Sequence, residues 1–190
     1  MRVLAFNGSP RKGGNTSILL GHFFEVLEAE GIKCEEIQTG YDLKGCLACG
    51  ACRAGLNRCV QDDDPLNGWV ESMKTADAIV LASPTYFGTV TGSMKNFMDR
   101  AGYVCRPQNL LYRKVGAPLV TARRGGAIQT YNTLLNFFGL AQMVVPMSSY
   151  WNFAYGSAVG EVLQDQEGLD TARNLGLNMA WLLQRLRAGK

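Results

Sequence analysis

The stretch DAIVLASP, residues 77–84, contains the clearest strand signal in the chain. Apolar residues follow one another without interruption from Ala78 to Ala82, and the turn-forming Pro84 ends the run. A continuous apolar run of this length indicates a strand that is buried on both faces, which is typical of parallel sheets covered by helices. The stretch therefore predicts an α/β fold.

Strand and helix signals alternate on both sides of this stretch. Further strands are predicted at residues 2–6, 32–38, 115–122 and 142–149. Helices are predicted from Asn15 to just before Gly31, from near Pro65, at 93–101, at 128–138 and at the C-terminus. The last helix is predicted to bury Ala172, Leu175, Met179, Leu182 and Leu186. Because crossovers between parallel strands are right-handed, we expect one doubly wound α/β domain over residues 1–190, with a five-stranded parallel sheet.

Composition and charge argue against two classes of partner. Charged residues make up 18% of the 190 residues and the net charge is +3, which falls short of the basic patch of a dedicated nucleic-acid binder. No segment approaches the roughly 18 consecutive apolar residues of a membrane-spanning helix. We therefore expect neither a nucleic-acid partner nor a membrane.

The cysteine content is informative once a compartment is assumed. The apolar run from Val3 to Phe6 is too short for the hydrophobic region of a signal peptide, so we expect a cytoplasmic protein. Thiols stay reduced in the cytoplasm. The six cysteines of the chain therefore favour metal or redox chemistry over a disulfide framework.

The stretch GSPRKGGNTS, residues 8–17, joins the first predicted strand to the first predicted helix. A helix N-terminus favours an anion, and the added hydroxyls and arginine suit a terminal phosphate. The stretch matches neither a Walker A loop nor the GxGxxG dinucleotide pattern, so a phosphomonoester fits best. The alternative is a turn and an ordinary helix cap. The candidate phosphate-binding residues are Ser9, Arg11, Gly14, Asn15, Thr16 and Ser17.

A second stretch, GCLACGACRAGLNRC at residues 45–59, places Cys46, Cys49, Cys52 and Cys59 close together. Four thiolates at tight spacing in a glycine-containing loop can hold a [4Fe–4S] cluster. A zinc ion and free, unligated thiols are the alternatives. The gap of six residues before Cys59, and the Val60 that follows it, differ from the bacterial ferredoxin pattern, so a second, ferredoxin-type cluster is not implied.

Other polar residues receive structural interpretations. Cys34 and Cys105 lie outside the loop and are expected to be small buried residues. His22 is the single histidine and lies inside the first helix, so a hydrolase built on a histidine base is not expected. The acidic run 62–64 is interpreted as the N-terminus of the helix that starts near Pro65.

Three segments together resemble a known family. GSPRKGGNTS resembles the phosphate loop of the flavodoxin-like NAD(P)H-dependent FMN reductases, and SPTYFGTVTGSMKNFMDR at residues 83–100 resembles their flavin-ring loop and the following helix. ARRGGA at residues 122–127 resembles their third flavin-contacting segment. The resemblance implies a flavodoxin-like fold, bound FMN and NAD(P)H as a possible electron donor.

The resemblance also marks residues for the flavin ring. Tyr86 and Phe87 offer aromatic surface for the isoalloxazine, with core packing as the alternative. Arg123 can stabilise an anionic reduced flavin or can be a solvated surface residue. The glycines allow a close approach of the backbone to the ring. The candidate ring-binding residues are Pro84, Thr85, Tyr86, Phe87, Gly88, Arg123, Gly125 and Gly126.

The cysteine spacing resembles the compact cluster motif of the iron-sulfur flavoprotein branch of this family. The resemblance implies FMN in each subunit, a [4Fe–4S] cluster on the four cysteines, and a homodimer or homotetramer in which flavin and cluster approach across an interface. The predicted function is an enzyme that passes electrons from NAD(P)H through FMN to a small-molecule acceptor such as a flavin or quinone. The alternative is an electron carrier that relays single electrons from ferredoxin-like partners without NAD(P)H.

Overall fold

A parallel sheet with the strand order β2–β1–β3–β4–β5 forms the centre of the protein. The computed structural model describes residues 1–40 and 42–189. The strands are β1 (Arg2–Asn7), β2 (Lys33–Gln38), β3 (Ala78–Pro84), β4 (Val115–Ala122) and β5 (Phe153–Tyr155). All four neighbouring pairs are parallel. The predicted flavodoxin-like α/β fold with a five-stranded parallel sheet is therefore confirmed.

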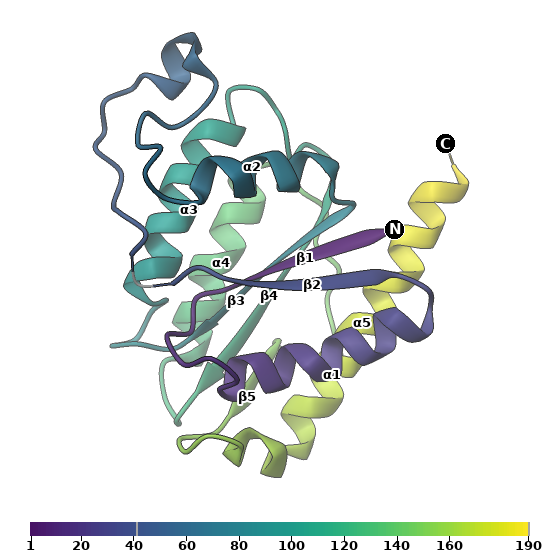
Figure 1. Cartoon of the computed structure of the whole chain (residues 1–190). Coiled ribbons are helices and arrows are strands. Elements are labelled where there is room, and N and C mark those ends of the chain that lie inside the picture. The colour runs from purple at the N-terminus through teal and green to yellow at the C-terminus, as the bar shows by residue number, and fades with distance from the viewer. Residues whose placement is uncertain (41, 190) are drawn as a thin grey trace.

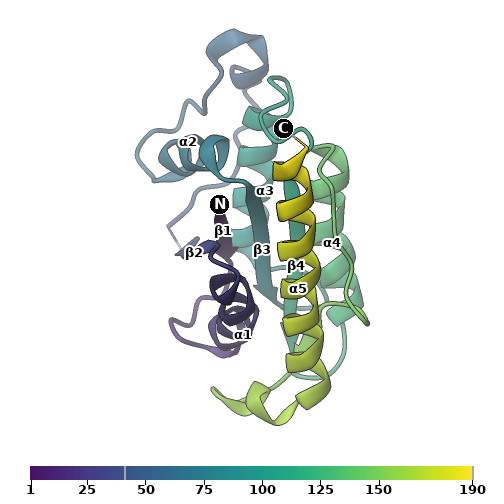
Figure 2. The same cartoon turned by 90° about the vertical axis from the view of Figure 1, so that its right-hand side faces the viewer.

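Helices cover both faces of the sheet (Figures 1 and 2). One face is covered by α1 (Asn15–Ala29) and α5 (Gln166–Ala188). The other is covered by α2 (Leu66–Thr75), α3 (Gly92–Cys105) and α4 (Ala127–Leu140). Two short helical turns complete the chain, η1 (Cys52–Leu56) and η2 (Glu161–Gln164).

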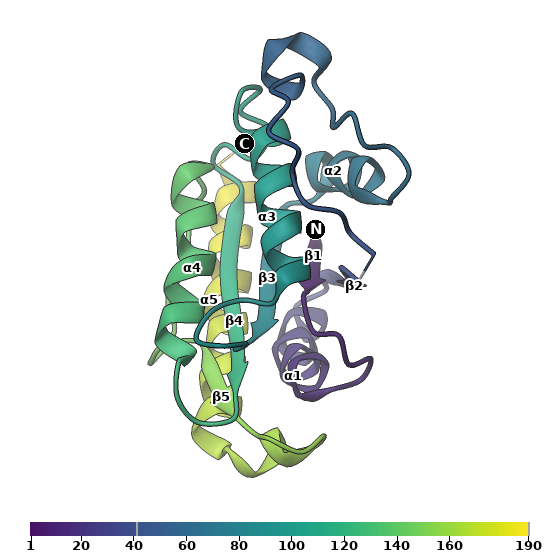
Figure 3. The ribbon, with the colours of Figure 1, turned by 90° about the vertical axis from the view of Figure 1, so that its left-hand side faces the viewer.

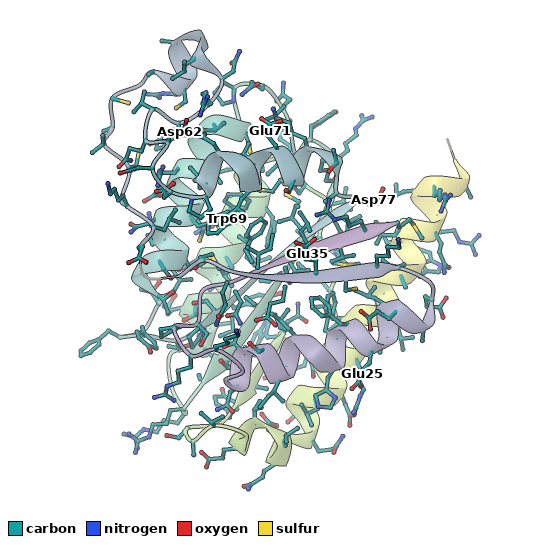
Figure 4. The ribbon with its side chains drawn as sticks, in the orientation of Figure 1. Glu25, Glu35, Asp62, Trp69, Glu71 and Asp77 are labelled. Atoms are coloured by element: carbon teal, nitrogen blue, oxygen red, sulfur yellow. The ribbon has the colours of Figure 1, made fainter. Side chains whose placement is uncertain are left out.

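The central strands explain why the sequence encodes two helical layers. In β1, Val3 and Ala5 join the core under α1 and α5, whereas Leu4 and Phe6 join the core under α2, α3 and α4. Trp69 extends from α2 toward the sheet (Figure 4) and lies against Phe6 and Phe97, with ring centroids 6.0 Å apart in each pair. Because successive strand residues point to opposite faces, an uninterrupted apolar run fills both cores.

The prediction of the fifth strand was wrong. Residues 142–149 leave the sheet, and in that range Val144 forms only an isolated bridge with Val115. Met143 and Val145 are only partly buried, Met147 is more than half exposed and Pro146 has no N–H for a ladder, so the pairing does not extend beyond Val144. The edge strand is instead β5, which pairs Phe153 with Val120.

The predicted buried face of the last helix was correct in its first half. Ala172, Leu175 and Met179 are buried in α5. Leu182 is only partly buried and Leu186 is exposed, whereas Leu183 takes the buried position. A helix advances 3.6 residues per turn, so the buried stripe continues from Met179 to Leu183 and leaves Leu186 on the outer side.

The ends of the elements define two regions for a site. The carboxyl ends of β3 and β4 point toward the bottom of Figure 3, where the loops after the strands gather. The long segment between β2 and α2 runs along α3, and its tip lies at the top of the same view. The predicted phosphate and flavin-ring loops belong to the first region and the cysteine loop belongs to the second.

Candidate functional site

A cavity of about 210 Å³ opens at the carboxyl ends of β1, β3 and β4. It brings together three loops that are far apart in the sequence, as expected for a doubly wound sheet. Its lining includes the predicted residues Ser9, Arg11, Asn15, Thr16, Pro84, Thr85, Tyr86 and Arg123. Its lining also includes Thr121, Ala122, Gly156 and Ser157, which the sequence did not single out.

The predicted phosphate loop presents the start of α1 to this cavity. Gly14 occupies the cap position, and no side chain of the described residues caps the helix there. The first backbone N–H groups of a helix have no partner within the helix, so they are free to bind an anion. Ser9 shapes the turn, because its hydroxyl accepts a hydrogen bond from the Arg11 N–H at 3.2 Å.

Asn15 and Thr16 connect this helix start to other segments. The Thr16 hydroxyl is buried and lies 2.8 Å from the hydroxyl of Thr121 in β4. The Asn15 amide donates to the carbonyl of Ala158 and accepts from the N–H of Gly160, both at 2.8 Å. Asn15 therefore fixes the segment after β5, although sequence reasoning assigned it to the phosphate.

Glu161 fixes the same segment from its other end. Its carboxylate accepts hydrogen bonds from the backbone N–H groups of Ser157 and Ala158, at 2.6 and 2.7 Å. These bonds hold the pKa of Glu161 below its usual value, with Ala158 contributing the most. Ser157 in turn accepts a hydrogen bond at 3.4 Å from Arg11. The segment therefore carries Ser157 to the cavity next to Arg11.

The loop after β3 is a tight turn. Tyr86 and Thr89 exchange backbone hydrogen bonds of 2.8 and 3.1 Å, and the two residues between them, Phe87 and Gly88, have φ values of 46° and 84°. Phe87 is fully exposed and Tyr86 is nearly half exposed. The core-packing interpretation of these two aromatic residues is therefore excluded, and both rings are free to contact a ligand.

The third predicted segment meets this turn from the end of β4. Gly126 has φ of +85°, and a Cβ atom there would lie 2.9 Å from Cγ2 of Thr85 and 3.2 Å from Cα of Gly88. A side chain at position 126 would therefore push the two loops apart. Gly125 and Gly126 line a neighbouring cavity of about 400 Å³ rather than the first one.

The hydroxyl of Ser17, which was predicted to bind phosphate, is engaged by residues of β1 and β2 instead. Its hydroxyl accepts a hydrogen bond from Asn7 at 3.0 Å and donates one to Glu36 at 2.7 Å. These contacts orient the hydroxyl toward β2. Ser17 and Gly14 are therefore left with their backbone groups as contacts for an anion.

The four predicted metal ligands share a second cavity, of about 70 Å³. Cys46, Cys49, Cys52 and Cys59 all contribute to its lining. Cys46 and Cys49 are exposed, whereas Cys52 and Cys59 are half-buried. The donor set is that of a four-thiolate cluster or zinc site. Within residues 1–40 and 42–189, no three metal-ligating side chains are arranged to hold an ion.

The thiols differ in their electrostatic surroundings. Burial raises the pKa of the Cys52 thiol, and negative charge on Cys46 and Cys49 raises it further. A bound metal cation would have the opposite effect on the pKa, because it favours thiolates. Burial raises the pKa of Cys34 and of Cys105 to about 12. These two thiols stay protonated. Cys105 is buried as predicted, whereas Cys34 is only partly buried.

The most important residue that sequence reasoning missed is Arg100, on α3. Its side chain is fully buried and pairs with Asp64. The acidic run was therefore only partly interpreted correctly. Asp64 accepts a hydrogen bond from the Leu66 N–H at 3.2 Å, which supports the start of α2. Its main partner is nevertheless Arg100, and Asp62 (Figure 4) pairs with Arg58.

His22 has the packing role expected from its place in α1. Its Nδ1 atom lies 3.0 Å from a guanidinium nitrogen of Arg173 and 3.4 Å from a carboxylate oxygen of Glu25. Both partners lie on α1 or α5, away from the two cavities. His22 therefore connects two helices of one layer.

Comparison with known proteins gives the family. Residues 1–158 match the family model described as NADPH-dependent FMN reductase. An iron-sulfur flavoprotein of Methanocaldococcus jannaschii is 34% identical over 98% of this chain and 100% of its own length. An iron-sulfur flavoprotein of Archaeoglobus fulgidus is 40% identical over 78% of this chain and 73% of its own length.

A solved structure supports the fold. RosB with bound 8-demethyl-8-formylriboflavin 5'-phosphate superimposes with a TM-score of 0.79 at 21% identity, covering 99% of this chain and 81% of that chain. In the described part of the chain, no helix is long and apolar enough to cross a membrane.

The family follows from the match over residues 1–158 and from the relative that aligns over its full length. The chain belongs to the NADPH-dependent FMN reductases, a family of flavin oxidoreductases, and to their iron-sulfur flavoprotein branch.

Proposed function

We propose that this protein is an FMN-dependent oxidoreductase of the NAD(P)H-dependent FMN or quinone reductase type. It takes electrons from NAD(P)H and reduces a small-molecule acceptor, in the cytoplasm, as a homodimer or homotetramer. FMN, when bound, supplies the hydride and electron chemistry. The observation that carries the proposal is the uncapped start of α1, which opens onto a cavity lined by Ser9, Arg11 and Thr16.

The residues of the first loop are assigned to the phosphate group. Arg11 supplies positive charge, and Ser9 and Thr16 supply hydroxyl groups at the cavity wall. Asn15 and Ser17, in the first turn of α1, supply backbone N–H groups, as does Gly14 before them. A group with one terminal phosphate uses all of these donors, which favours FMN over a dinucleotide.

The residues of the second and third loops are assigned to the ring. Pro84, Thr85 and Tyr86 line the cavity next to the phosphate donors, and Phe87 and Gly88 form the projecting turn. The exposed aromatic rings exclude water from one side of a bound isoalloxazine. Arg123 lines the same cavity and supplies positive charge for a reduced, anionic ring, and Gly126, more than its neighbour Gly125, lets the third loop approach the turn at Gly88.

Phosphate recognition by Arg11 gives the sharpest test. Charge-assisted hydrogen bonds contribute roughly 1.5–3 kcal/mol each, so Arg11→Ala is expected to weaken FMN binding by about tenfold or more. Riboflavin, which has no phosphate, should lose much less affinity. Lys12→Ala is the matched control, because Lys12 carries the same charge outside the cavity lining. Equal losses for FMN and riboflavin would contradict the proposal, as would FAD in the heat-released cofactor.

A second candidate function is supported by the cavity that the four cysteines share. In this version the chain is an electron carrier that exchanges single electrons with ferredoxin-like partners through a [4Fe–4S] cluster on Cys46, Cys49, Cys52 and Cys59. The two functions are compatible, because the flavin residues and the cysteines lie in separate cavities. If the four cysteines bind zinc or stay unligated, only the flavin reductase function remains.

Anaerobic reconstitution separates these possibilities. We expect wild-type protein to take up iron and sulfide in cluster stoichiometry and to show broad visible absorbance. Cys59→Ala should abolish this absorbance, keep bound flavin and keep any direct reduction by NAD(P)H, but lose reduction by ferredoxin. Cys34→Ala, outside the loop, is the control and should behave as wild type. Wild-type protein without iron and sulfide would overturn the cluster assignment.

A further inference from the structure

Arg100 is a charged side chain in the interior of the protein. Its guanidinium group is fully buried beneath the cysteine loop, where an unpaired charge would be strongly destabilising. Asp64 neutralises it with both carboxylate oxygens, one of them 3.1 Å from Nη2 and the other bonded to Nη1. Such a bidentate pair fixes the orientation of the planar group as well as its charge.

The remaining donors of Arg100 also go to the loop. Nη1 donates to the carbonyl of Lys44 at 3.2 Å and Nη2 donates to the carbonyl of Gln61 at 3.1 Å. Nε donates to the sulfur of Cys59 at 3.3 Å. Every N–H group of the guanidinium therefore has an acceptor between residues 44 and 64. One side chain of α3 thus holds both ends of the cysteine loop.

Cys59 is held from two directions. Its backbone N–H donates to Oδ1 of Asn67 at 2.9 Å, and its carbonyl accepts from Nδ2 of Asn67 at 3.1 Å. Asn67 therefore fixes the main chain, while Arg100 fixes the sulfur atom. None of the other three loop cysteines has a described hydrogen bond from a charged side chain to its sulfur.

We infer that Arg100 is a positioning residue for the cysteine site, which fixes Cys59 as a ligand and raises the reduction potential of the cluster. The inference rests on the cluster proposed above. An N–H group directed at a ligating sulfur stabilises the more negative, reduced state, so it raises the potential. Because Asp64 neutralises the guanidinium charge, the effect comes from the directed N–H group rather than from net charge.

The position of Arg100 on α3 also relates the two cavities. Thr91 caps the start of α3, and its hydroxyl donates to the carbonyl of Gly8 at 2.8 Å, beside the phosphate loop. Arg100 lies eight residues after Gly92, or about 12 Å along the helix axis. The same rigid helix therefore contacts the loops of the first cavity at one end and the cysteine loop further along.

Two variants test the inference. Arg100→Lys keeps a positive charge but loses the fork of donors and the Nε–H bond to Cys59. The double variant Arg100→Gln with Asp64→Asn removes both buried charges together, which guards against the misfolding that an unpaired Asp64 would cause. Arg58→Gln is the matched control, because it breaks an exposed ion pair, with Asp62, in the same loop.

The first measurement uses metal-free protein. Amide hydrogen exchange of residues 45–61 should become faster by at least about tenfold in both Arg100 variants, because the loop loses its anchor. Exchange in the sheet should stay unchanged, and Arg58→Gln should match wild type. Unchanged loop exchange in both variants would overturn the inference.

The second measurement uses reconstituted protein. Iron and sulfide content should fall in the variants, FMN content should stay constant, and the remaining cluster should show a lower midpoint potential in a redox titration followed by EPR. A merely structural role would reduce the content but leave the potential unchanged, and this result would overturn the tuning role. If the cluster proposal itself is wrong, reconstituted wild-type protein will contain no iron and sulfide, which distinguishes this failure from a failure of the role of Arg100.

Discussion

The hydroxyl groups of Thr16 in α1 and Thr121 in β4 lie 2.8 Å apart and are both buried. This contact joins the helix that receives the proposed phosphate to the strand that forms the cavity wall. The two residues are 105 positions apart in the sequence, so no single motif contains both. The cavity therefore depends on a contact between two elements that fold together only in the native sheet.

Replacing one of these hydroxyl groups should affect stability and binding together. Thr16→Val keeps the side-chain shape and leaves the Thr121 hydroxyl buried without its partner, so the free energy of unfolding should fall by about 1–3 kcal/mol. FMN affinity should fall in the same variant. Urea unfolding followed by circular dichroism measures the first effect. Thr16→Ser keeps the hydroxyl and should retain most of the stability, and an unchanged midpoint in Thr16→Val would contradict the prediction.

The close approach of the second and third loops predicts a large difference between two adjacent glycines. Gly126→Ala places a methyl group 2.9 Å from Thr85 and forces alanine into a left-handed conformation, which costs roughly 1–2 kcal/mol. The turn at 85–88 should move, and flavin affinity should fall by about tenfold, equivalent to 1.4 kcal/mol.

Gly125→Ala is the control for this prediction, because nothing lies within 4 Å of a Cβ atom at Gly125. Flavin fluorescence titrations of both variants measure the difference. Similar affinities for Gly125→Ala and Gly126→Ala would show that contact between the two loops does not shape the site.

Phe87 should matter for binding but not for folding. Its ring is fully exposed, so Phe87→Ala should change the free energy of unfolding by less than about 0.5 kcal/mol. Loss of an aromatic contact with the flavin ring should weaken binding by roughly 0.5–1.5 kcal/mol. Leu140→Ala removes another exposed apolar side chain and lies outside the cavity lining, so it should alter neither quantity. A thermal shift as large for Phe87→Ala as for a core substitution would refute the prediction.

The lowered pKa of Glu161 predicts a pH dependence near the cavity. Because the pKa is lowered in the folded protein, the carboxylate stabilises the segment at and above the usual glutamate range, and this contribution is lost as the pH falls through the lowered value. NMR shifts of the Ser157 and Ala158 amides should therefore titrate with a midpoint below the model-peptide value of about 4.3. The titration should vanish in Glu161→Gln. A midpoint at or above that value in wild type would disprove the assignment.

The fold was predictable where burial is continuous in sequence. The runs in β3 and β4 have apolar residues on both faces, so their pattern alone indicated a central strand. The error at residues 142–149 has a physical cause. The hydropathy of residues 142–149 does not reveal that their pairing with β4 stops at Val144, nor that the three residues Phe153–Tyr155 form the edge strand instead.

The site was predictable where its residues are neighbours in the chain. Ser9 and Arg11 lie just before α1 and Thr16 lies in its first turn, and their spacing was enough to predict an anion site. Thr121 had a usable signal, since it lies near the carboxyl end of a predicted strand. Ser157 had no such signal in the sequence. Its segment is fixed by contacts of Asn15 with residues about 140 positions further along the chain.

Arg100 shows the limit of reading a helix by its own pattern. An arginine in a helix is normally exposed, and only the packing of residues 44–64 over α3 makes this one interior. Its partners Asp64 and Cys59 were each recognised, but for separate reasons. Whether a charged side chain is buried depends on which segment, distant in sequence, packs over it. The hydropathy of the helix carries no information about that segment.

The way in which Arg100 holds the cysteine loop has a consequence for how this branch diverged. Residues 42–64 form no strand and enter the chain between β2 and α2, so a lineage could shorten them without disturbing the sheet. Deletion would uncover Arg100 and remove its acceptors at Lys44, Gln61 and Asp64 together, so nothing would then require an arginine at this position. Relatives that lack the segment should therefore tolerate other residues at the position of Arg100.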